Sequence, residues 1–234
     1  MKRHLLFLAA LLIVNLAASA QKKFSVYAVG FYNQENLFDT CHDEGKKDYE
    51  YLPNKGWNGM KYTNKLRNMS KALADMGTDV LPTVGCAFIG LSEVENHKVL
   101  DALVDQAPLK ARNMKYVHIE GPDRRGIDCA LLYNPSLFSV KNVKLLPYVQ
   151  ELAKDSAFFT RGFLTVRGEM AGDDVAVIVC HWPSRFSGPF YRESAARQVK
   201  VIKDSLLNVN QEMKIFVMGD MNDDPVNKSM HVYL

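Results

Sequence analysis

The chain has 234 residues, of which 47% are hydrophobic and 24% are charged, and its formal net charge at pH 7 is +3. These values are those of an ordinary globular protein with room for one large domain, and the sequence shows no repeat, low-complexity tract or interdomain linker. The charge gives no support for a strongly basic nucleic-acid binder, although a local basic patch is compatible with it.

Residues 1–20 have the pattern of a secretory signal peptide. Basic Lys2 and Arg3 precede an apolar run at Leu5–Leu16, and the small residues Ala18–Ala20 follow as a cleavage site. The run is too short to span a bilayer comfortably, so no stable membrane insertion is expected. A buried first helix is the alternative, but the order of basic, apolar and small residues favours export to the periplasm or the medium. Removing Lys2 and Arg3 lowers the formal charge from +3 to +1.

After residue 20 the sequence predicts a single layered α/β domain. We expect strands at residues 24–31, 86–96, 128–133, 158–166, 175–182 and 214–218, and helices at 62–76, around 99–104 and at 192–207. The helix at 62–76 has apolar residues at helical spacing, with Gly77 as its stop. Residues 39–61 are polar and are expected to form a long loop. Helices between the early strands, followed by strands with hairpin-like turns, favour mixed sheets.

The four cysteines, Cys41, Cys86, Cys129 and Cys180, lie far apart in the sequence. They form no CxxC metal or redox signature. Three of them fall in apolar runs, where a free thiol packs as a small hydrophobic group. Export would permit a disulfide, but we interpret these three as inert buried thiols.

Several apolar strands end in a small set of polar groups. The segments are "YNQENLF" with Asn33 and Asn36, "LSEVEN" with Glu93 and Glu95, "CHWPSR" with His181 and Arg185, and "GDMND" with Asp220 and Asn222. One such residue is usually only part of a turn. Four chemically complementary cases predict a site, because functional side chains in layered α/β folds collect at strand ends.

The chemistry of these groups indicates the type of site. Carboxylates with amide oxygens suit a hard cation such as Mg²⁺ or Mn²⁺, and there is too little Cys and His clustering for zinc. Neutral histidine and arginine suit a phosphate group. A metal, a carboxylate that orients water, and donors to a phosphoryl oxygen are the parts of metal-assisted phosphoester hydrolysis. A nucleophile triad is not supported, because no Ser lies in a GxSxG elbow.

Five motifs together resemble a known superfamily. In chain order they are "YNQENLFD", "GLSEVEN", "DRRGIDCALLYNP", "CHWPSR" and "VMGDMNDDP", and the match runs from about Phe24 to Pro225, nearly the whole chain after residue 20. They resemble the endonuclease/exonuclease/phosphatase superfamily, the fold of DNase I and exonuclease III, and most closely its exported members from Bacteroides-type bacteria. The resemblance implies an α/β four-layer sandwich of two mixed β-sheets flanked by helices.

The resemblance also implies residue roles. Glu93 would be the main metal ligand, and Asn33 beside it would hold the metal or a water molecule. Asp220 would orient or deprotonate the attacking water. Asn222 would donate a hydrogen bond to the phosphorane-like state, and His181 would bind a phosphate oxygen.

Three arginines are candidates for substrate binding. Arg125 would contact the substrate phosphate; the alternative is a solvated pair with Arg124. Arg185 would also bind the phosphate, and Arg197 is a further candidate for positioning the substrate.

Other residues leave two interpretations open. Glu95 and Asn96 are interpreted as caps of the following helix. Asp128 is either a turn residue or a ligand. Trp57 and Trp182 either stack on a base or pack against the long loop.

The resemblance predicts that the domain at residues 21–234 lacks its C-terminal part. Members of the superfamily continue beyond the "GDMND" motif, add strands to the second sheet and end near an Asp-His pair. The last residue here is Leu234, and His231 is interpreted as part of the tail. We therefore expect an incomplete second sheet and a chain that is poorly soluble, and inactive even if folded.

The predicted function is divalent-metal-dependent hydrolysis of phosphoester bonds by a monomeric phosphodiesterase or nuclease, with DNA or RNA as candidate substrates. One alternative is a phosphomonoesterase acting on small phosphorylated metabolites. The other is a catalytically inactive interaction protein of the same fold.

Overall fold

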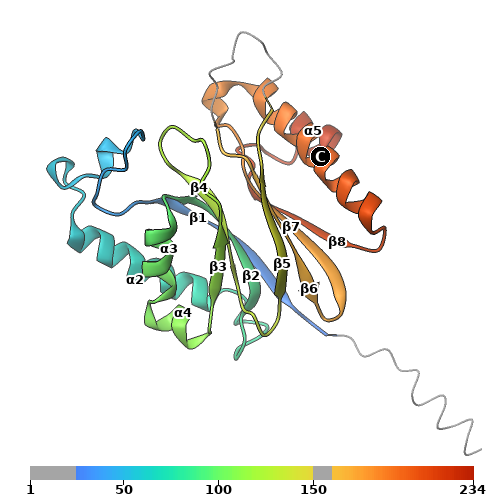
Figure 1. Ribbon diagram of the computed structural model, residues 1–234, viewed down its shortest axis with the longest axis horizontal. Helices are drawn as coiled ribbons and strands as arrows, with labels where there is room; N and C mark the ends of the chain where they lie inside the picture. Colours follow the sequence, from blue (N-terminus) through green and yellow to red (C-terminus); the bar gives the residue numbers. More distant parts are fainter. Residues whose placement is uncertain (1–24, 150–159) are drawn as a thin grey trace, which may run out of the picture.

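The computed structural model describes residues 25–149 and 160–234, so the predicted signal peptide at residues 1–20 lies outside it. The described residues form two four-stranded sheets that pack against each other, with helices on both outer faces (Figure 1). None of the described helices is long and apolar enough to cross a membrane.

The first sheet has the strand order β1-β2-β4-β3. Its strands are β1 (Ala28–Leu37), β2 (Cys86–Val94), β3 (Lys115–His118) and β4 (Asp128–Tyr133). β1 runs parallel to β2, and the other two pairs are antiparallel. Its outer face is covered by α2 (Gly59–Asp75), α3 (His97–Val104) and α4 (Ala107–Ala111).

The second sheet has the order β5-β6-β7-β8. Its strands are β5 (Ser139–Leu146), β6 (Phe163–Met170), β7 (Asp173–His181) and β8 (Lys214–Asp220). β7 and β8 are parallel, and the other pairs are antiparallel. The helix α5 (Pro189–Val209) covers the outer face, and a π-helical turn, η5 (Ser229–Tyr233), packs beside it. Arg185–Ser187 form a short 3-10 turn, η4, before α5.

Three apolar layers lie between the four layers of secondary structure. Along β7, Val177 and Val179 face the other sheet, whereas Ile178 and Cys180 face α5. Side chains alternate because successive residues of a strand point to opposite faces. Both faces are buried, which explains why this strand is continuously apolar in the sequence. The predicted four-layer sandwich of two mixed sheets is confirmed.

Most predicted elements are present, with shifted ends. β4 has the predicted bounds. The helix α2 is capped by Asn58 at its start, and it ends two residues before Gly77, whose φ of 75° favours glycine. β1 extends to Leu37, so Asn33 lies within a strand and not after one. The strand predicted at 158–166 begins at Phe163, and residues 158–159 lie outside the described part.

Two strands and one α-helix were not predicted. β3 is only four residues long, α4 only five, and β5 carries lysine and asparagine between its apolar residues. The predicted loop at 39–61 contains two short 3-10 turns, η1 (Tyr49–Tyr51) and η2 (Pro53–Lys55), and the first turn of α2.

All four cysteines are free thiols. Cys86, Cys129 and Cys180 are buried, as predicted for inert thiols, and Cys41 is exposed. Burial raises the pKa of the Cys180 thiol to about 12, so that thiol is unreactive at neutral pH.

Candidate active site

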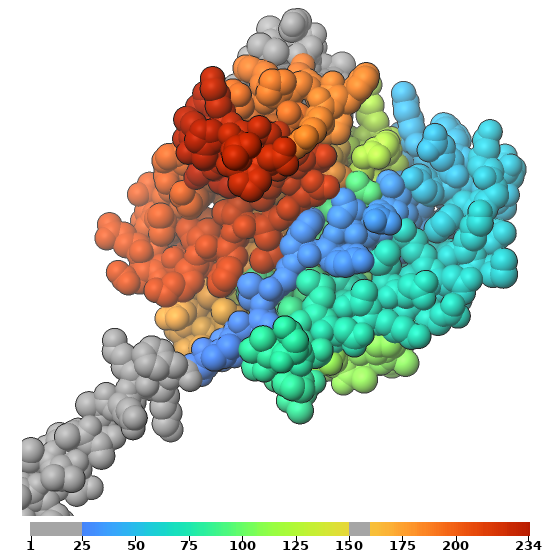
Figure 2. Space-filling view, turned by 180° about the vertical axis from the view of Figure 1, so that it is seen from behind, coloured from blue at the N-terminus to red at the C-terminus, as the bar shows by residue number. Residues whose placement is uncertain are grey.

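Most of the predicted site residues lie together near the carboxyl ends of the two parallel strand pairs; they are Asn33, Glu93, His181, Asp220 and Asn222. In β7 and β8, His181 and Asp220 are direct neighbours at the carboxyl ends of their strands. Asn33 of β1 donates from Nδ2 to Oδ2 of Asp220 over 3.0 Å, which connects the first sheet to the second. Figure 2 shows the segment with β1 crossing the surface between α2 and the C-terminal part of the chain. Both sheets therefore contribute to one site.

Glu93 is held at a bulge by its backbone. The register of β2 against β4 shifts between Ser92 and Val94, so Glu93 has no strand partner there, and its φ is 60°. Such a conformation costs a non-glycine residue about 1–3 kcal/mol and is concentrated at functional sites. The Glu93 Oε2 atom accepts a hydrogen bond from the Asn36 backbone at 2.9 Å. Asn36 and Asn222 also have positive φ, at 61° and 52°.

Asp220 is fixed by two hydrogen bonds. Oδ2 accepts from Asn33, and Oδ1 accepts from the backbone N–H of Asn222 at 3.0 Å. The preceding Gly219 is required by space, because a Cβ there would lie 2.1 Å from the carbonyl oxygen of Cys180. The carboxylate therefore has one orientation, facing the cavity described below.

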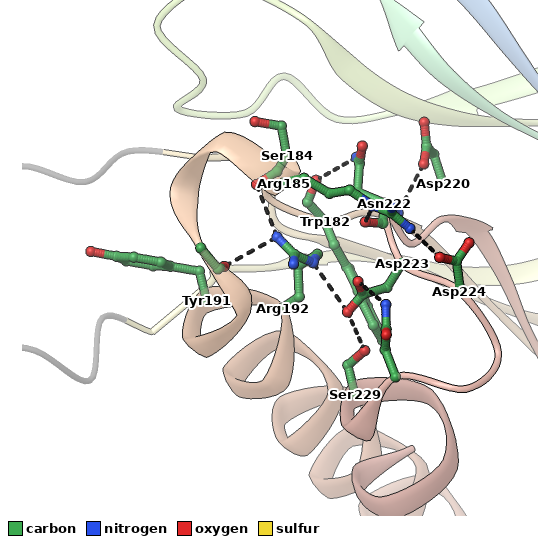
Figure 3. Close-up of polar contacts among 12 residues, drawn as sticks. Trp182, Ser184, Arg185, Tyr191, Arg192, Asp220, Asn222, Asp223, Asp224 and Ser229 are labelled. Atoms are coloured by element: carbon green, nitrogen blue, oxygen red, sulfur yellow. Dashed lines mark hydrogen bonds and ion pairs between the residues drawn. The ribbon is translucent and has the colours of Figure 1, made fainter.

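The loop that carries Asp220 and Asn222 is supported from behind (Figure 3). The side chain of Asn222 donates to the carbonyl oxygen of Trp182 at 3.1 Å. Below it, Asp223 forms a buried ion pair with Arg192 of α5 at 3.1 Å and accepts from the Ser229 hydroxyl at 2.6 Å. These groups connect the loop to α5 and η5.

His181 is a neutral imidazole. Burial lowers its pKa, as do the positive charges of Arg161 and Arg125, to about 2. Its Nε2 atom lies 3.6 Å from Oε1 of Glu93, which is beyond hydrogen-bond distance. A neutral ring carries one N–H that can donate to a phosphate oxygen.

A cavity of about 310 Å³ opens at these residues. It is lined by Glu93, Arg125, Thr160, Arg161, His181, Pro183, Ser184, Ser187, Asp220 and Asn222. Carboxylates and arginines share this lining, so the cavity presents both signs of charge.

The three candidate arginines have different positions. Arg125 is exposed and lines the cavity, as expected for a phosphate contact. Arg185 lies outside that lining, where it is exposed, pairs with Asp224 at 2.7 Å and donates to the Asn222 carbonyl. Arg197 stacks 5.0 Å above the ring of Tyr233, on the α5 side.

Two cavity residues, Thr160 and Arg161, were not predicted from the sequence. Arg161 forms an ion pair with Asp123 at 3.1 Å and donates to the Trp182 carbonyl at 3.1 Å. The available signal was a charged residue inside the apolar run "FFTRGFL", where burial without a partner is unfavourable.

The remaining interpretations are resolved by contacts. Asn96 caps α3, as predicted, by accepting from Lys98 and Val99. The predicted cap role of Glu95 is wrong: its carboxylate accepts from the Asp39 backbone at 2.7 Å, because it is turned back toward the 39–61 loop.

Asp128 is not a turn residue. It is the first residue of β4, accepts from the Gly121 backbone at 3.0 Å and contacts His118 at 3.2 Å. It thereby anchors the loop that carries Arg125.

The two tryptophans pack against the protein. Trp182 is 1% exposed, so stacking on a base is excluded for it. Trp57 donates from its indole to the carbonyls of Phe38 and Asp39, which ties it to the long loop.

The oxygen donors fit a Mg²⁺ ion of the type that keeps several waters. The described residues contain no cluster of three or more His, Cys, Asp or Glu side chains that could enclose a metal. Mg²⁺ is commonly bound by one or two carboxylates together with water and substrate phosphate. Glu93 supplies one carboxylate of such a partial set. Asn33, which is hydrogen-bonded to Asp220 of the same site, would add its amide oxygen, which accepts from the Glu35 backbone at 2.7 Å and keeps a second lone pair for the ion.

Comparisons with known proteins identify the family. The family model described as "Endonuclease/Exonuclease/phosphatase family" matches residues 28–234. This match confirms the resemblance drawn from the five motifs. Comparison with curated proteins gives no match.

Solved structures share the fold. A functionally unknown conserved protein from Enterococcus faecalis V583 is 15% identical, with a TM-score of 0.57 over 87% of this chain and 70% of that one. A humanized D. rerio TDP2 with 14 mutations is 13% identical, with a TM-score of 0.53 over 86% of this chain and 65% of its own. D. rerio TDP2 complexed with a single strand DNA product is 14% identical, with a TM-score of 0.52 over 74% and 60%. The chain thus spans less than two thirds of these TDP2 chains.

Proposed function

The chain belongs to the endonuclease/exonuclease/phosphatase family, whose members hydrolyse phosphoester bonds, and we propose that it is a divalent-metal-dependent phosphodiesterase that acts on nucleic acid. The observation that carries the proposal is the hydrogen bond between Asn33 and Asp220. It joins a strand of the first sheet to the end of β8 in the second, beside Glu93 and His181.

Glu93 and Asn33 would hold the metal, for which we propose Mg²⁺, with Mn²⁺ as a substitute. The bound ion would supply Lewis-acid stabilisation of charge on the phosphoryl oxygens. The chain's contribution is to present the Glu93 carboxylate at a bulge, fixed by the Asn36 backbone, so that its Oε1 atom stays outside hydrogen-bond distance of His181. A ligand held in this way needs little rearrangement on binding.

Asp220 would orient the attacking water and accept its proton. Its two hydrogen bonds, from Asn33 and Asn222, fix the carboxylate before substrate arrives. A positioned base of this kind contributes about 10²–10⁴-fold to a rate.

His181 and Asn222 would bind phosphoryl oxygens as neutral donors. The imidazole of His181 is neutral at pH 7 because its pKa is lowered by burial first and then by Arg161 and Arg125. The Asn222 amide uses one N–H on the Trp182 carbonyl and keeps a second for substrate. Neutral donors stabilise charge that develops in the transition state without binding every anion equally.

Nucleic acid is the substrate class that we favour. The D. rerio TDP2 structure with a single strand DNA product shares this fold, and the exposed Arg125 at the cavity can contact a nucleotide phosphate. The decisive assay compares a single-stranded oligonucleotide, bis(p-nitrophenyl) phosphate and p-nitrophenyl phosphate, each with Mg²⁺ and with EDTA. The proposal is supported if the chain cleaves the oligonucleotide and bis(p-nitrophenyl) phosphate with Mg²⁺ and if EDTA abolishes this cleavage. Turnover of p-nitrophenyl phosphate alone identifies a phosphomonoesterase. A folded chain that hydrolyses none of the three substrates contradicts both the phosphodiesterase and the phosphomonoesterase function.

The metal role of Glu93 is tested by Glu93→Gln. We expect weaker Mg²⁺ binding in calorimetry and a loss of activity of at least about tenfold, as the loss of one charged ligand contact predicts. Glu95→Gln is the matched control, since it makes the same change two residues along. Burial raises the pKa of Glu95 to about 8, so this carboxyl is largely protonated at pH 7 and glutamine resembles it. Equal effects of the two variants would contradict the assignment of Glu93.

We also propose export, on the basis of the basic, apolar and small residues within 1–20. Fractionation of the expressing cells, with mass determination of the mature amino terminus, tests it. Cytoplasmic protein that retains Met1 would contradict export.

A further inference from the structure

The lining of the cavity contains two buried polar atoms that have no partner among the described residues. Thr160 is 5% exposed, and the Arg161 side chain is 9% exposed. Within the described part of the chain, neither the Thr160 hydroxyl nor Arg161 Nε has a hydrogen-bond partner. Buried polar groups are nearly always paired, so two adjacent exceptions that line one cavity indicate a place for a ligand.

The guanidinium of Arg161 is held rigidly by its other two nitrogens. Nη1 donates to Asp123 Oδ2 and Nη2 donates to the Trp182 carbonyl, each at 3.1 Å. The same carbonyl accepts the Asn222 side chain. Arg161 is therefore coupled through one backbone oxygen to a residue of the proposed reaction, and its Nε–H remains for an additional acceptor.

The sign of the local charge identifies that acceptor. Arg161 and Arg125 both line the cavity and bring two guanidinium groups to it. Glu93 and Asp220 line the same cavity. An anion with oxygens that accept from a hydroxyl and an arginine N–H fits beside these arginines, and a phosphoryl group has this chemistry.

We propose that Thr160 and Arg161 form a subsite for a non-bridging oxygen of the substrate phosphoryl group, with Thr160 Oγ–H and Arg161 Nε–H as the donors. The inference rests on the proposed phosphodiesterase activity and adds two substrate-binding residues to it. It also gives the Asp123–Arg161 pair a role, which is to position the guanidinium.

Thr160→Val is the sharpest test, because it removes the hydroxyl and keeps the shape. The buried hydroxyl has no partner in the described structure, so we expect folding to be unaffected. Binding of inorganic phosphate is measured by calorimetry in EDTA at constant ionic strength. We expect phosphate affinity to fall by about tenfold, as for a lost hydrogen bond to a charged group. Thr160→Ser, which keeps the hydroxyl, should restore affinity.

Thr165→Val is the matched control. Thr165 lies on β6, is 6% exposed and also has a hydroxyl without a partner among the described residues, but it lies outside this cavity. Its phosphate affinity should equal that of the unmodified chain. Equal affinity in Thr160→Val and Thr165→Val, or no phosphate binding by the unmodified chain, would overturn the subsite.

Arg161→Lys provides a second test, because lysine keeps the charge but lacks the Nε–H donor in a planar fork. We expect a loss of phosphate affinity larger than that of Thr160→Val, with a higher KM for the diester. The outcomes separate the two proposals. Phosphate binding that depends on Thr160, without diester hydrolysis, keeps the subsite and rejects the function. Diester hydrolysis by a chain whose phosphate affinity does not change in Thr160→Val keeps the proposed function and rejects the subsite.

Discussion

Two buried arginine–aspartate pairs lie beside the site, and they have the same chemistry but different surroundings. Arg161 and Asp123 are 3.1 Å apart with side chains 9% and 6% exposed, and Arg192 and Asp223 are also 3.1 Å apart, at 6% and 3%. Arg161 lines the cavity, whereas Arg192 lies behind the catalytic loop and donates to backbone carbonyls of the turn before α5. Burial and pairing alone thus do not separate a binding residue from a scaffold residue.

The difference predicts two kinds of variant. Groups that face the cavity should affect turnover with little effect on stability, and groups behind the loop should affect stability with little effect on the specific activity of the folded fraction. Function and stability are then controlled by neighbouring residues of one short segment, 219–224.

Asp220→Asn should have the largest effect, on the cavity side. We expect kcat to fall by about 10²–10⁴-fold because the positioned base is removed. The melting temperature should change little, since the asparagine oxygen can still accept one of the two present hydrogen bonds. The measurements are diester hydrolysis with Mg²⁺ and thermal unfolding.

Asp224→Asn is the control for that change, because Asp224 is four residues further on, exposed and outside the cavity lining. It should retain most of the activity. A large fall in melting temperature for Asp220→Asn with normal specific activity would contradict the catalytic role of Asp220 and would make it a residue that supports the fold.

Asp223→Asn should have the next largest effect, on the scaffold side. Removing one partner of a buried pair leaves Arg192 uncompensated, which destabilises by about 3–5 kcal/mol. Denaturant unfolding at pH 7 measures this loss. The double variant Asp223→Asn with Arg192→Met should recover part of it, because the unpaired charge is then absent. An unchanged free energy of unfolding would show that the pair does not support the loop.

The same variant has a predicted pH dependence. Burial alone would raise the pKa of Asp223, but hydrogen bonds from Ser229 and Arg192 bring it below its ordinary value of 3.8. A carboxyl with a depressed folded pKa contributes stability that is present above the unfolded pKa and is lost as pH falls through the folded one. The stability difference between the unmodified chain and Asp223→Asn should therefore shrink below about pH 3.8. A difference that grows on acidification would contradict this sign.

The sequence predicted the site where chemistry and strand pattern coincide. Asp220 directly ends an apolar strand, and His181 does the same on the neighbouring strand, so parallel pairing was enough to bring them together. The family resemblance then supplied the roles. Glu93 was predicted from the same pattern. Its positive φ was not predicted, because glycine is the usual sequence sign of that conformation and none stands there.

The features that could not be predicted from the sequence depend on contacts between segments that are distant in the chain. Thr160 and Arg161 precede β6, and the contacts of Arg161 with Asp123 and with the Trp182 carbonyl hold this segment at the cavity. The neutral state of His181 follows from burial by both sheets and from two arginines distant in sequence. β5 was missed because a register shift between Val140 and Asn142 places two polar residues between Val140 and Val143, which interrupts the alternation.

Arg185→Ala should have the smallest effect, and it tests the one predicted phosphate ligand that the structure places outside the cavity lining. Arg185 already pairs with Asp224 and donates to the Asn222 carbonyl, both at the exposed rim. Its influence on substrate should therefore be through long-range charge, which salt screens beyond about 8–10 Å. We expect kcat/KM to fall by less than about tenfold at low salt, and by less still as salt increases, since exposed pairs contribute little. Arg185→Lys, which keeps the charge, should be close to the unmodified chain. A loss of a hundredfold or more that persists at high salt and is not restored by lysine would make Arg185 a direct phosphate ligand. The cavity would then have to extend across the 222–224 turn when substrate binds.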